Sequence, residues 1–462
     1  MSEKLLGLRR DLGLWGAAAI VVGTVIGSGV FVVPKRAVIA TGSPDWVTLV
    51  WVVGGLLSLA GALTYAELSA MMPEAGGEYV YLKEAYGPFF GYIYGWTQFW
   101  VAKSGSIATL ASGFLIYLTN FVPILEQTFA TVPIPLGPHG GPLELKLGQL
   151  AAMGIILFLA GVNYFGVKAG GQLQIVVTIA KVGLLLGIIA LGLFSSQGNT
   201  ANFTSSVMPN PGGSSGFFVA LVAILWAYDG WNNVSMVSSE IKNPQRNLPL
   251  ALIFGTLGVM AIYLLANTAY FYVLSSAEVA ASDRVPAQMM RKLFGAAGAN
   301  WVSVAAMISI FSALNGSILS GGRVPYAMAR DGLFFKKIAE VHPKYRSPAQ
   351  SMLWLSLWSA VLVFSGAYDQ LAAYVVFASW ILYGMTAASV IVLRHKRPDL
   401  ERPYKTWGYP VVPGLFVLAA AILIFFTLKD QPRESLLGLG IIALGIPFYW
   451  YWSRLKKAQP PV

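Results

Sequence analysis

The chain has 462 residues, of which 56% are hydrophobic and only 11% are charged. Soluble globular domains carry about 25% charged residues, so this composition, with a mean hydropathy of +0.64, excludes a soluble protein and indicates one that crosses a membrane repeatedly. The net charge of +11 lies mostly in short loops between apolar runs, where basic residues set topology. We therefore expect the lipid bilayer as a partner and no nucleic acid.

Twelve apolar runs have roughly the 20 residues that cross the hydrocarbon core of a bilayer. They lie at 12–33, 46–70, 88–121, 147–166, 172–195, 216–239, 249–274, 298–322, 350–366, 370–393, 410–428 and 435–453. An even number of spans places both termini on one side. With cytoplasmic termini, the inner segments hold 21 Lys and Arg and the outer loops 8, Lys35 and Arg36 being a local exception. The runs predict an all-α protein of twelve transmembrane helices in the cell membrane. The charge asymmetry predicts that both termini are cytoplasmic.

The chain contains no cysteine and three scattered histidines, His139, His342 and His395. Disulfides and thiolate metal sites are therefore excluded, and the histidines form no metal-binding pattern. The sequence also offers no side-chain nucleophile together with a general base that could activate it. We expect no metal, no cofactor and no enzymatic activity.

Small residues interrupt the first run, in Gly23-Thr-Val-Ile-Gly-Ser-Gly-Val-Phe31. A break in hydrocarbon leaves backbone groups without hydrogen bonds unless it lines a cavity. The N–H groups at a half-helix N-terminus attract a carboxylate, so this break is a candidate substrate site. The alternative is a helix-packing face formed by Gly23 and Gly27.

The sixth run has a matching interruption, Trp226-Ala-Tyr-Asp-Gly-Trp-Asn-Asn233, five spans after the first. Broken helices in corresponding positions of two halves are typical of inverted-repeat transporters that bind substrate between the halves. We predict one transmembrane domain over 1–462. It would contain five-helix repeats at 12–195 and 216–393, followed by helices 11 and 12 within 410–453.

Seven motifs resemble those of the amino acid–polyamine–organocation superfamily, and within it the L-type amino acid transporter branch. They are Gly23 to Phe31, Tyr65-Ala-Glu-Leu68, Pro73-Glu-Ala-Gly-Gly-Glu-Tyr79, Trp226 to Asn232, Glu240-Ile-Lys-Asn-Pro-Gln-Arg-Asn-Leu-Pro249, Gly322-Arg-Val-Pro-Tyr-Ala-Met-Ala-Arg-Asp-Gly332 and Leu393-Arg-His-Lys-Arg-Pro398. The resemblance extends from near Leu8 to near Trp452. It implies a LeuT-like fold with discontinuous helices 1 and 6, and sodium-independent amino acid transport, usually by obligatory exchange.

The resemblance also implies a zwitterion site at the two breaks. The substrate carboxylate would rest on Ser28 and Gly29, and the ammonium would meet the carbonyls of Ile26, Trp226 and Asp229. The predicted site further includes Gly27, Ala227, Tyr228, Gly230 and Asn232. Trp226 would be an aromatic gate and Trp380, in the tenth span, a gate or pocket residue, with ordinary membrane packing as the alternative for both.

Two lysines lie within predicted spans. An ammonium in hydrocarbon needs partners, a polar interior or loss of its proton. Lys181 resembles a replacement for the sodium ion of coupled relatives, contacting the first break and Ser309, whereas Ala313 stands where some relatives have a further serine. Snorkelling to an interface is the alternative. Lys103 occupies a position that is basic in the L-type pattern, and either tunes the pocket or is structural.

We predict an obligatory exchanger of neutral amino acids that works by alternating access. Proton-coupled symport through Lys181 remains open, as does acceptance of cationic amino acids or polyamines through Asp229. A channel is disfavoured because the polar residues concentrate at two breaks rather than in repeated rings, and a receptor because the chain lacks an internal domain. Animal L-type transporters attach to a heavy chain through a cysteine in the loop corresponding to 122–146, which this chain lacks. We expect a monomeric, prokaryotic-type carrier without a disulfide-linked heavy chain.

Overall fold

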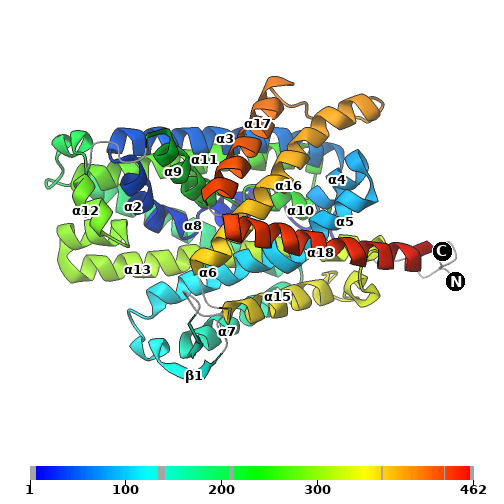
Figure 1. Ribbon diagram of the computed structural model, residues 1–462, viewed down its shortest axis with the longest axis horizontal. Helices are drawn as coiled ribbons and strands as arrows, with labels where there is room; N and C mark the ends of the chain where they lie inside the picture. The colour runs from blue at the N-terminus through cyan, green and yellow to red at the C-terminus, as the bar shows by residue number, and fades with distance from the viewer. Residues whose placement is uncertain (1–6, 134–140, 208–212, 366–367, 431, 458–462) are drawn as a thin grey trace.

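Long helices run along the longest axis of the molecule (Figure 1), and two interrupted helices pack against them. The computed structural model describes residues 7–133, 141–207, 213–365, 368–430 and 432–457. The first half contains α1 (Leu14–Val25), α2 (Gly29–Thr41), α3 (Pro44–Met71), α4 (Glu78–Tyr86), α5 (Pro88–Thr97), the π-helical turn η1 (Gln98–Ala102), α6 (Lys103–Leu118), α7 (Leu147–Tyr164) and α8 (Val167–Leu193).

The second half begins with α9 and ends with α18. Its helices are α9 (Gly213–Tyr228), α10 (Asn233–Met236), α11 (Pro244–Val273), α12 (Ser276–Ala281), α13 (Val285–Gly321), α14 (Arg323–Arg330), α15 (Ala349–Val363), α16 (Tyr368–Lys396), α17 (Val411–Asp430) and α18 (Pro432–Lys457). Short 3₁₀ turns are η2 (Pro123–Glu126), η4 (Thr200–Thr204), η5 (Ser238–Glu240) and η6 (Lys336–Ala339). Proline begins α3, α5 and α11, where its fixed φ and missing N–H suit the first helical position.

Within the described residues, nine helical stretches are long and apolar enough to cross a membrane, and the bent pair α1 and α2 makes ten. Two shorter apolar helices, Gly216–Tyr228 and Ala349–Val363, coincide with the sixth and ninth predicted runs. Length and composition therefore support a protein with many spans, and the number twelve stays a prediction.

A two-stranded sheet departs from the all-α expectation. β1 (Thr128–Val132) pairs antiparallel with β2 (Leu143–Lys146), between α6 and α7. β1 is rich in β-branched and aromatic residues, Thr-Phe-Ala-Thr-Val, which favour a strand. The loop is long enough to fold back on itself outside the spans.

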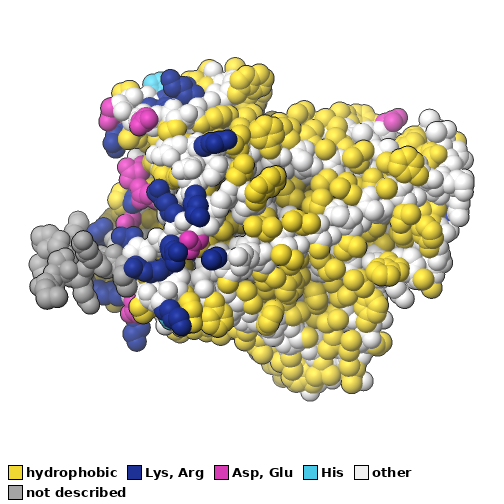
Figure 2. All heavy atoms as spheres, turned by 180° about the vertical axis from the view of Figure 1, so that it is seen from behind, with side chains coloured by type: hydrophobic (Ala, Val, Ile, Leu, Met, Phe, Trp, Pro, Cys, Tyr) yellow, Lys and Arg dark blue, Asp and Glu magenta, His cyan; other side chains and the backbone are white. Residues whose placement is uncertain are grey.

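The surface between the two ends of the molecule is mainly hydrophobic on the face shown in Figure 2, and Lys and Arg gather at one end. Comparison with Figure 1 places this charged end where α4 and the last turns of α18 lie. Exposed apolar side chains on the long helices include Phe158, Val176, Ile179 and Phe254. Such a large apolar surface is stable only when it is covered by lipid.

The end of the molecule with α4 and α14 is called the α4 end, and the opposite end, with α12, is called the α12 end (Figure 1). The interrupted helices lie between them: α1 packs on α8, α11 and α13, and α2 packs on α9. This packing surrounds both breaks with other helices.

Candidate functional site

The first break separates α1, which ends at Val25, from α2, which begins at Gly29. The two helices are bent by 41°, so Ile26, Gly27 and Ser28 leave the helical path. The N-terminus of α2 therefore faces the break, where its partial positive charge and its N–H groups favour an anion.

The second break separates α9, which ends at Tyr228, from α10, which begins at Asn233. Gly230 has φ +106°, in the left-handed region that glycine adopts without a steric penalty. The hydroxyl of Thr24 lies 2.8 Å from the carbonyl oxygen of Gly230. Because Thr24 belongs to the last turn of α1, this contact joins the two breaks.

The two breaks pack directly on each other. A Cβ atom built on Gly29 would lie 2.5 Å from the Cβ of Ala227, which is closer than two non-bonded carbon atoms can approach. The hydroxyl of Tyr263 lies 2.9 Å from both the carbonyl oxygen of Val25 and that of Ala227. The close approach of α2 and α9 thus depends on glycine.

A cavity of about 30 Å³ lies between the breaks. Seven predicted site residues line it: Gly27, Ser28, Gly29, Trp226, Ala227, Asp229 and Gly230. The other lining residues were not predicted from the sequence: Thr24, Val25, Ser106, Leu110, Asn233 and Ser317. Helical spacing offered a signal for two of them, because Ser106 follows Lys103 by three residues and Ser317 follows Ser309 by eight.

Three predicted site residues do not line this cavity. The carbonyl of Ile26 accepts hydrogen bonds from Lys181 and Ser309. The ring of Tyr228 packs edge-on against Trp51 and Tyr263, which also contact each other.

The third is Asn232, whose amide donates to a buried carboxylate, that of Glu78. Its neighbour Asn233 lines the cavity instead. Consecutive residues at a helix start point in different directions, so the sequence motif alone did not distinguish the two amides. Glu78, within the Pro73 to Tyr79 motif, was missed as a partner of this break.

Lys181 on α8 reaches the first break. Its Nζ lies 2.6 Å from the carbonyl oxygen of Gly23, 2.5 Å from that of Ile26 and 3.5 Å from that of Ser309. The hydroxyl of Ser309 lies 3.0 Å from the carbonyl oxygen of Ile26 and 3.1 Å from that of Gly27. The side chain is 2% exposed, so this lysine does not snorkel, and it ties α1, α8 and α13 together.

Opposite charges approach the cavity from two sides. The Nζ of Lys103 donates to the side-chain oxygen of Asn233 at 2.5 Å, and the hydroxyl of Tyr383 donates to Asp229 at 2.8 Å. Lys103 and Asp229 also interact electrostatically. Lys103 directly follows the π-helical turn η1, a distortion that is frequent at functional sites.

Trp380 lies farther from the breaks. It stacks on Phe416 at a centroid distance of 5.5 Å and meets Tyr383 edge-on at 6.1 Å. It lines a separate cavity of about 10 Å³ with Phe377 and Leu423. Trp380 therefore contacts Tyr383, which in turn donates a hydrogen bond to Asp229, and Trp380 does not line the cavity between the breaks.

The path from the breaks to the α4 end is closed. A buried ion pair joins Arg323 to Glu240, with Nε and Oε1 2.6 Å apart and both side chains at most 1% exposed. Backbone hydrogen bonds join Leu12 to Glu240 and to Lys242, at 3.0 and 2.7 Å. The segments before α1 and after α10 are thereby held against α13 and α14.

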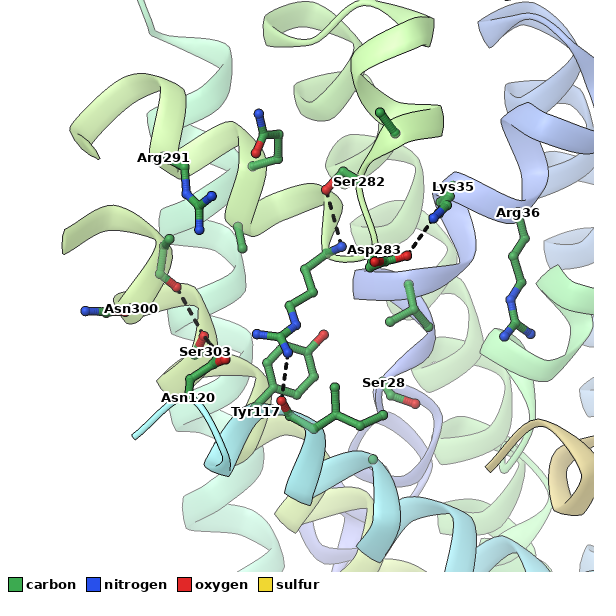
Figure 3. Close-up of a pocket in the computed structure, with 18 residues that line it drawn as sticks. Ser28, Lys35, Arg36, Tyr117, Asn120, Ser282, Asp283, Arg291, Asn300 and Ser303 are labelled. Carbon is green, nitrogen blue, oxygen red and sulfur yellow. Dashed lines mark hydrogen bonds and ion pairs between the residues drawn. The ribbon is translucent and has the colours of Figure 1, made fainter. Parts of the chain in front are cut away.

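Toward the α12 end a much larger cavity, of about 840 Å³, reaches Ser28 (Figure 3). Ser28 lines both this cavity, named here the vestibule, and the smaller one between the breaks. The structure thus has a cavity that meets the breaks at Ser28 on one side and buried polar contacts on the other. In the described part of the chain, no group of three or more His, Asp or Glu could hold a metal ion.

The chain is similar in sequence to one protein family and to several transporters. The family described as "Amino acid permease" matches residues 12–446. The b(0,+)-type amino acid transporter 1 of Homo sapiens is 34% identical over 98% of this chain and 90% of its own length. The serine/threonine exchanger SteT of Bacillus subtilis is 33% identical over 98% of this chain and 99% of its own length. The cystine/glutamate transporter of Homo sapiens is 29% identical over 98% and 87%.

The family match covers both breaks, the Lys181 contacts and the closed α4 end. The resemblance seen in the motifs is therefore confirmed over nearly the whole chain. The protein is a membrane transporter rather than an enzyme, and the chain belongs to the amino acid permease family, within the amino acid–polyamine–organocation superfamily.

Proposed function

We propose that this protein is a sodium-independent obligatory exchanger of neutral amino acids. The observation that carries the proposal is the cavity between the breaks, where the N-terminus of α2 meets the C-terminal end of α9. One helix end attracts a carboxylate and the other an ammonium. An amino acid zwitterion presents both groups.

The substrate carboxylate rests on the hydroxyl and backbone of Ser28 and the backbone of Gly29. The ammonium meets the carbonyl groups at the end of α9, near Trp226 and Asp229. The Ile26 carbonyl takes no part, because it already accepts from Lys181 and Ser309. This assignment moves the ammonium toward the sixth span relative to the position that the resemblance implies.

Lys181 accounts for sodium independence. Its ammonium supplies a fixed positive charge where α1 unwinds, and it bonds to carbonyl oxygens of Gly23 and Ile26. Carbonyl oxygens are also the ligands of a bound sodium ion at broken helices. The covalently attached charge therefore holds the break in shape without a coupling ion.

Lys103 and Asp229 support neutral selectivity. One positive and one negative group adjoin the same buried cavity, so these two groups together add no net formal charge to it. A substrate with a charged side chain would bring an unpaired charge into a desolvated site, which is unfavourable. Asp229 without Lys103 would instead suit cationic amino acids.

Exchange follows from alternating access. The cavity of about 30 Å³ is smaller than an amino acid, so binding requires Trp226 and the surrounding helices to move. A bound zwitterion contacts both α2 and α9 and lowers the barrier between the two conformations. The empty carrier lacks this bridge and crosses slowly, so each inward step needs an outward one.

The topology of the proposal is that of the LeuT-like fold. The repeats at 12–195 and 216–393 place a broken helix at the start of each half, α1 with α2 and α9 with α10. The basic α4 end faces the cytoplasm, as the positive-inside rule predicts, and the vestibule opens outward. The carrier acts as a monomer in the cell membrane.

Counterflow in proteoliposomes tests this function. Purified protein is reconstituted, and labelled neutral, cationic and acidic amino acids are offered outside with unlabelled amino acid inside. We expect uptake of neutral amino acids only when amino acid is present inside, with no change when choline replaces sodium. Uptake into empty liposomes that rises with an inward proton gradient would instead establish symport. Uptake led by lysine or a polyamine would establish cationic selectivity.

A further inference from the structure

The vestibule at the α12 end carries an excess of positive charge that the exchange cycle described above does not use. Four cationic side chains line it, Lys35, Arg36, Arg284 and Arg291, together with a single carboxylate, Asp283. Figure 3 shows Lys35, Arg36, Asp283 and Arg291 around the opening, on α2 and on the segment from α12 to α13. Four cations and one carboxylate give the lining a formal charge of +3.

The carboxylate is neutralised within the lining. The Oδ1 of Asp283 lies 2.5 Å from the Nζ of Lys35. Lys35, by this hydrogen bond and by its charge, holds the pKa of Asp283 below its usual range, so the carboxylate stays ionised at neutral pH and remains engaged. Of the other cations in the lining, Arg284 and Arg291 have no ion pair with a described carboxylate, so their guanidinium groups can accept an incoming anion.

The remaining cations have guanidinium groups. Arg284 is held in place, because its Nη2 donates to the carbonyl oxygen of Ile116 at 2.9 Å and its guanidinium lies 5.2 Å from the ring centre of Tyr117. Arg291 is exposed on α13, with no ion pair to any described carboxylate. Guanidinium groups present paired N–H donors that match the two oxygens of a carboxylate.

We propose that the vestibule is a capture site for carboxylates, which holds an incoming amino acid by its α-carboxylate before transfer to Ser28. The inference rests on the proposed function, since it concerns how substrate reaches that site. The substrate zwitterion has no net charge, so the guanidinium groups act on it at short range, through paired charge-assisted hydrogen bonds to its carboxylate. Ser28 lines both cavities, so a carboxylate held by the guanidinium groups next meets the N-terminus of α2.

A dicarboxylate that lacks an ammonium should occupy the vestibule and go no farther. Succinate is therefore the probe, with labelled neutral amino acid as the transported substrate. For the wild-type protein we expect succinate to inhibit uptake by raising the apparent KM. We also expect inhibition by succinate, a dianion, to weaken when ionic strength increases from about 0.01 to about 0.15 M, because the Debye length shortens from about 30 to about 8 Å.

Removing a positive charge and removing the negative charge should have opposite effects, which makes the test specific. Arg291→Gln, alone and with Arg284→Gln, should raise KM at least about threefold, weaken inhibition by succinate and reduce the salt effect, with kcat nearly unchanged. Asp283→Asn removes the carboxylate, which raises the formal charge of the lining by one, and should strengthen succinate inhibition. Lys429→Gln, an exposed cation outside the lining, is the matched control and should change none of these.

A second measurement separates this inference from the exchange function. Succinate should raise the unfolding temperature of the purified wild-type protein and have less effect on Arg291→Gln, whether or not the protein transports amino acids. Absence of amino acid exchange in the wild-type protein would overturn the proposed function alone. Arginine variants that match Lys429→Gln in KM and in succinate response, or that change only kcat, would overturn the capture site.

Discussion

The Nζ of Lys181 lies 2.5 Å from the carbonyl oxygen of Ile26, so an α8 side chain occupies the place where the first transmembrane helix unwinds. Lys181→Met keeps the length of the side chain and removes its charged donor. Hydrogen bonds to charged groups contribute about 1.5–3 kcal/mol each, so we expect exchange to fall at least tenfold and the unfolding temperature to drop.

The matched control for this prediction is Lys168→Met. Lys168 is an exposed lysine near the start of the same helix. It should leave counterflow and thermal stability unchanged. Retention of normal exchange by Lys181→Met would show that the break holds its shape without this lysine.

Gly29→Ala should separate the two breaks. The added Cβ would lie 2.5 Å from the Cβ of Ala227, so α2 and α9 must move apart. The groups on α2 that bind the substrate carboxylate and those on α9 that bind its ammonium would then be too far from each other. We expect loss of exchange by a protein that still folds, measured by counterflow and by the yield of monodisperse protein. Gly183→Ala is the control, because its Cβ meets no atom within 4 Å and alanine is favoured over glycine in a helix by up to about 1 kcal/mol.

Tyr383→Phe tests the carboxylate in the cavity. The change removes the hydroxyl that donates to Asp229 and keeps the ring. We expect KM for neutral amino acids to rise about threefold to tenfold, the effect of one hydrogen bond of about 0.5–1.5 kcal/mol. Tyr92→Phe is the control, since the buried hydroxyl of Tyr92 has no hydrogen-bond partner among the described residues. Equal KM values for the two variants would remove Tyr383 and Asp229 from substrate binding.

The ion pair between Arg323 and Glu240 should show strong energetic coupling. Removing one partner of a buried pair leaves an unpaired charge and costs about 3–5 kcal/mol. Arg323→Met and Glu240→Met should therefore each destabilise the protein more than half as much as both together, in denaturation of the purified protein. The exposed pair of Arg397 and Glu84, 3.8 Å apart, provides the comparison cycle, with coupling below about 1 kcal/mol. Additive effects at the buried pair would contradict this prediction.

Glu78 should make stability depend on pH. It begins α4, outside the candidate spans, and burial raises its pKa although Asn232 donates to it. The folded protein thus keeps this proton to a higher pH than the unfolded chain does, so stability should fall as pH rises from the ordinary pKa to the raised one.

Thermal unfolding between about pH 5 and about pH 8 checks this sign. Glu78→Gln should reduce the dependence, whereas Glu84→Gln, an exposed residue on the same helix, should keep it. Parallel curves for the wild-type protein and Glu78→Gln would exclude Glu78 as the source.

Local sequence was informative where the backbone itself is unusual. Glycine and small residues within an apolar run have few uses other than a break, and a lysine within a span must find oxygen atoms. The positions of both breaks could therefore be predicted. The family resemblance implied that Lys181 contacts the first break, but it assigned the Ile26 carbonyl to the substrate ammonium rather than to Lys181. The pairing of Arg323 with Glu240 could not, because 83 residues separate them in the chain and nothing local selects the partner.

Side-chain direction was the other limit. Asn232 and Asn233 have the same chemistry, and only the turn of α10 determines which one lines the cavity. The β1 and β2 hairpin was missed for a related reason, since its two strands are short and pair across a loop. In both cases the deciding interaction is tertiary.

The two adjacent asparagines have one more consequence. Asn232 is bonded to Glu78 on α4, and Asn233 to Lys103 on α6, so the start of α10 is anchored in two directions at once. Shifting α10 by a small amount would weaken both contacts before any new one formed. The second break should therefore change position as an all-or-none step that carries α4 with it, which makes α4 the place to attach a spectroscopic reporter of the transport cycle.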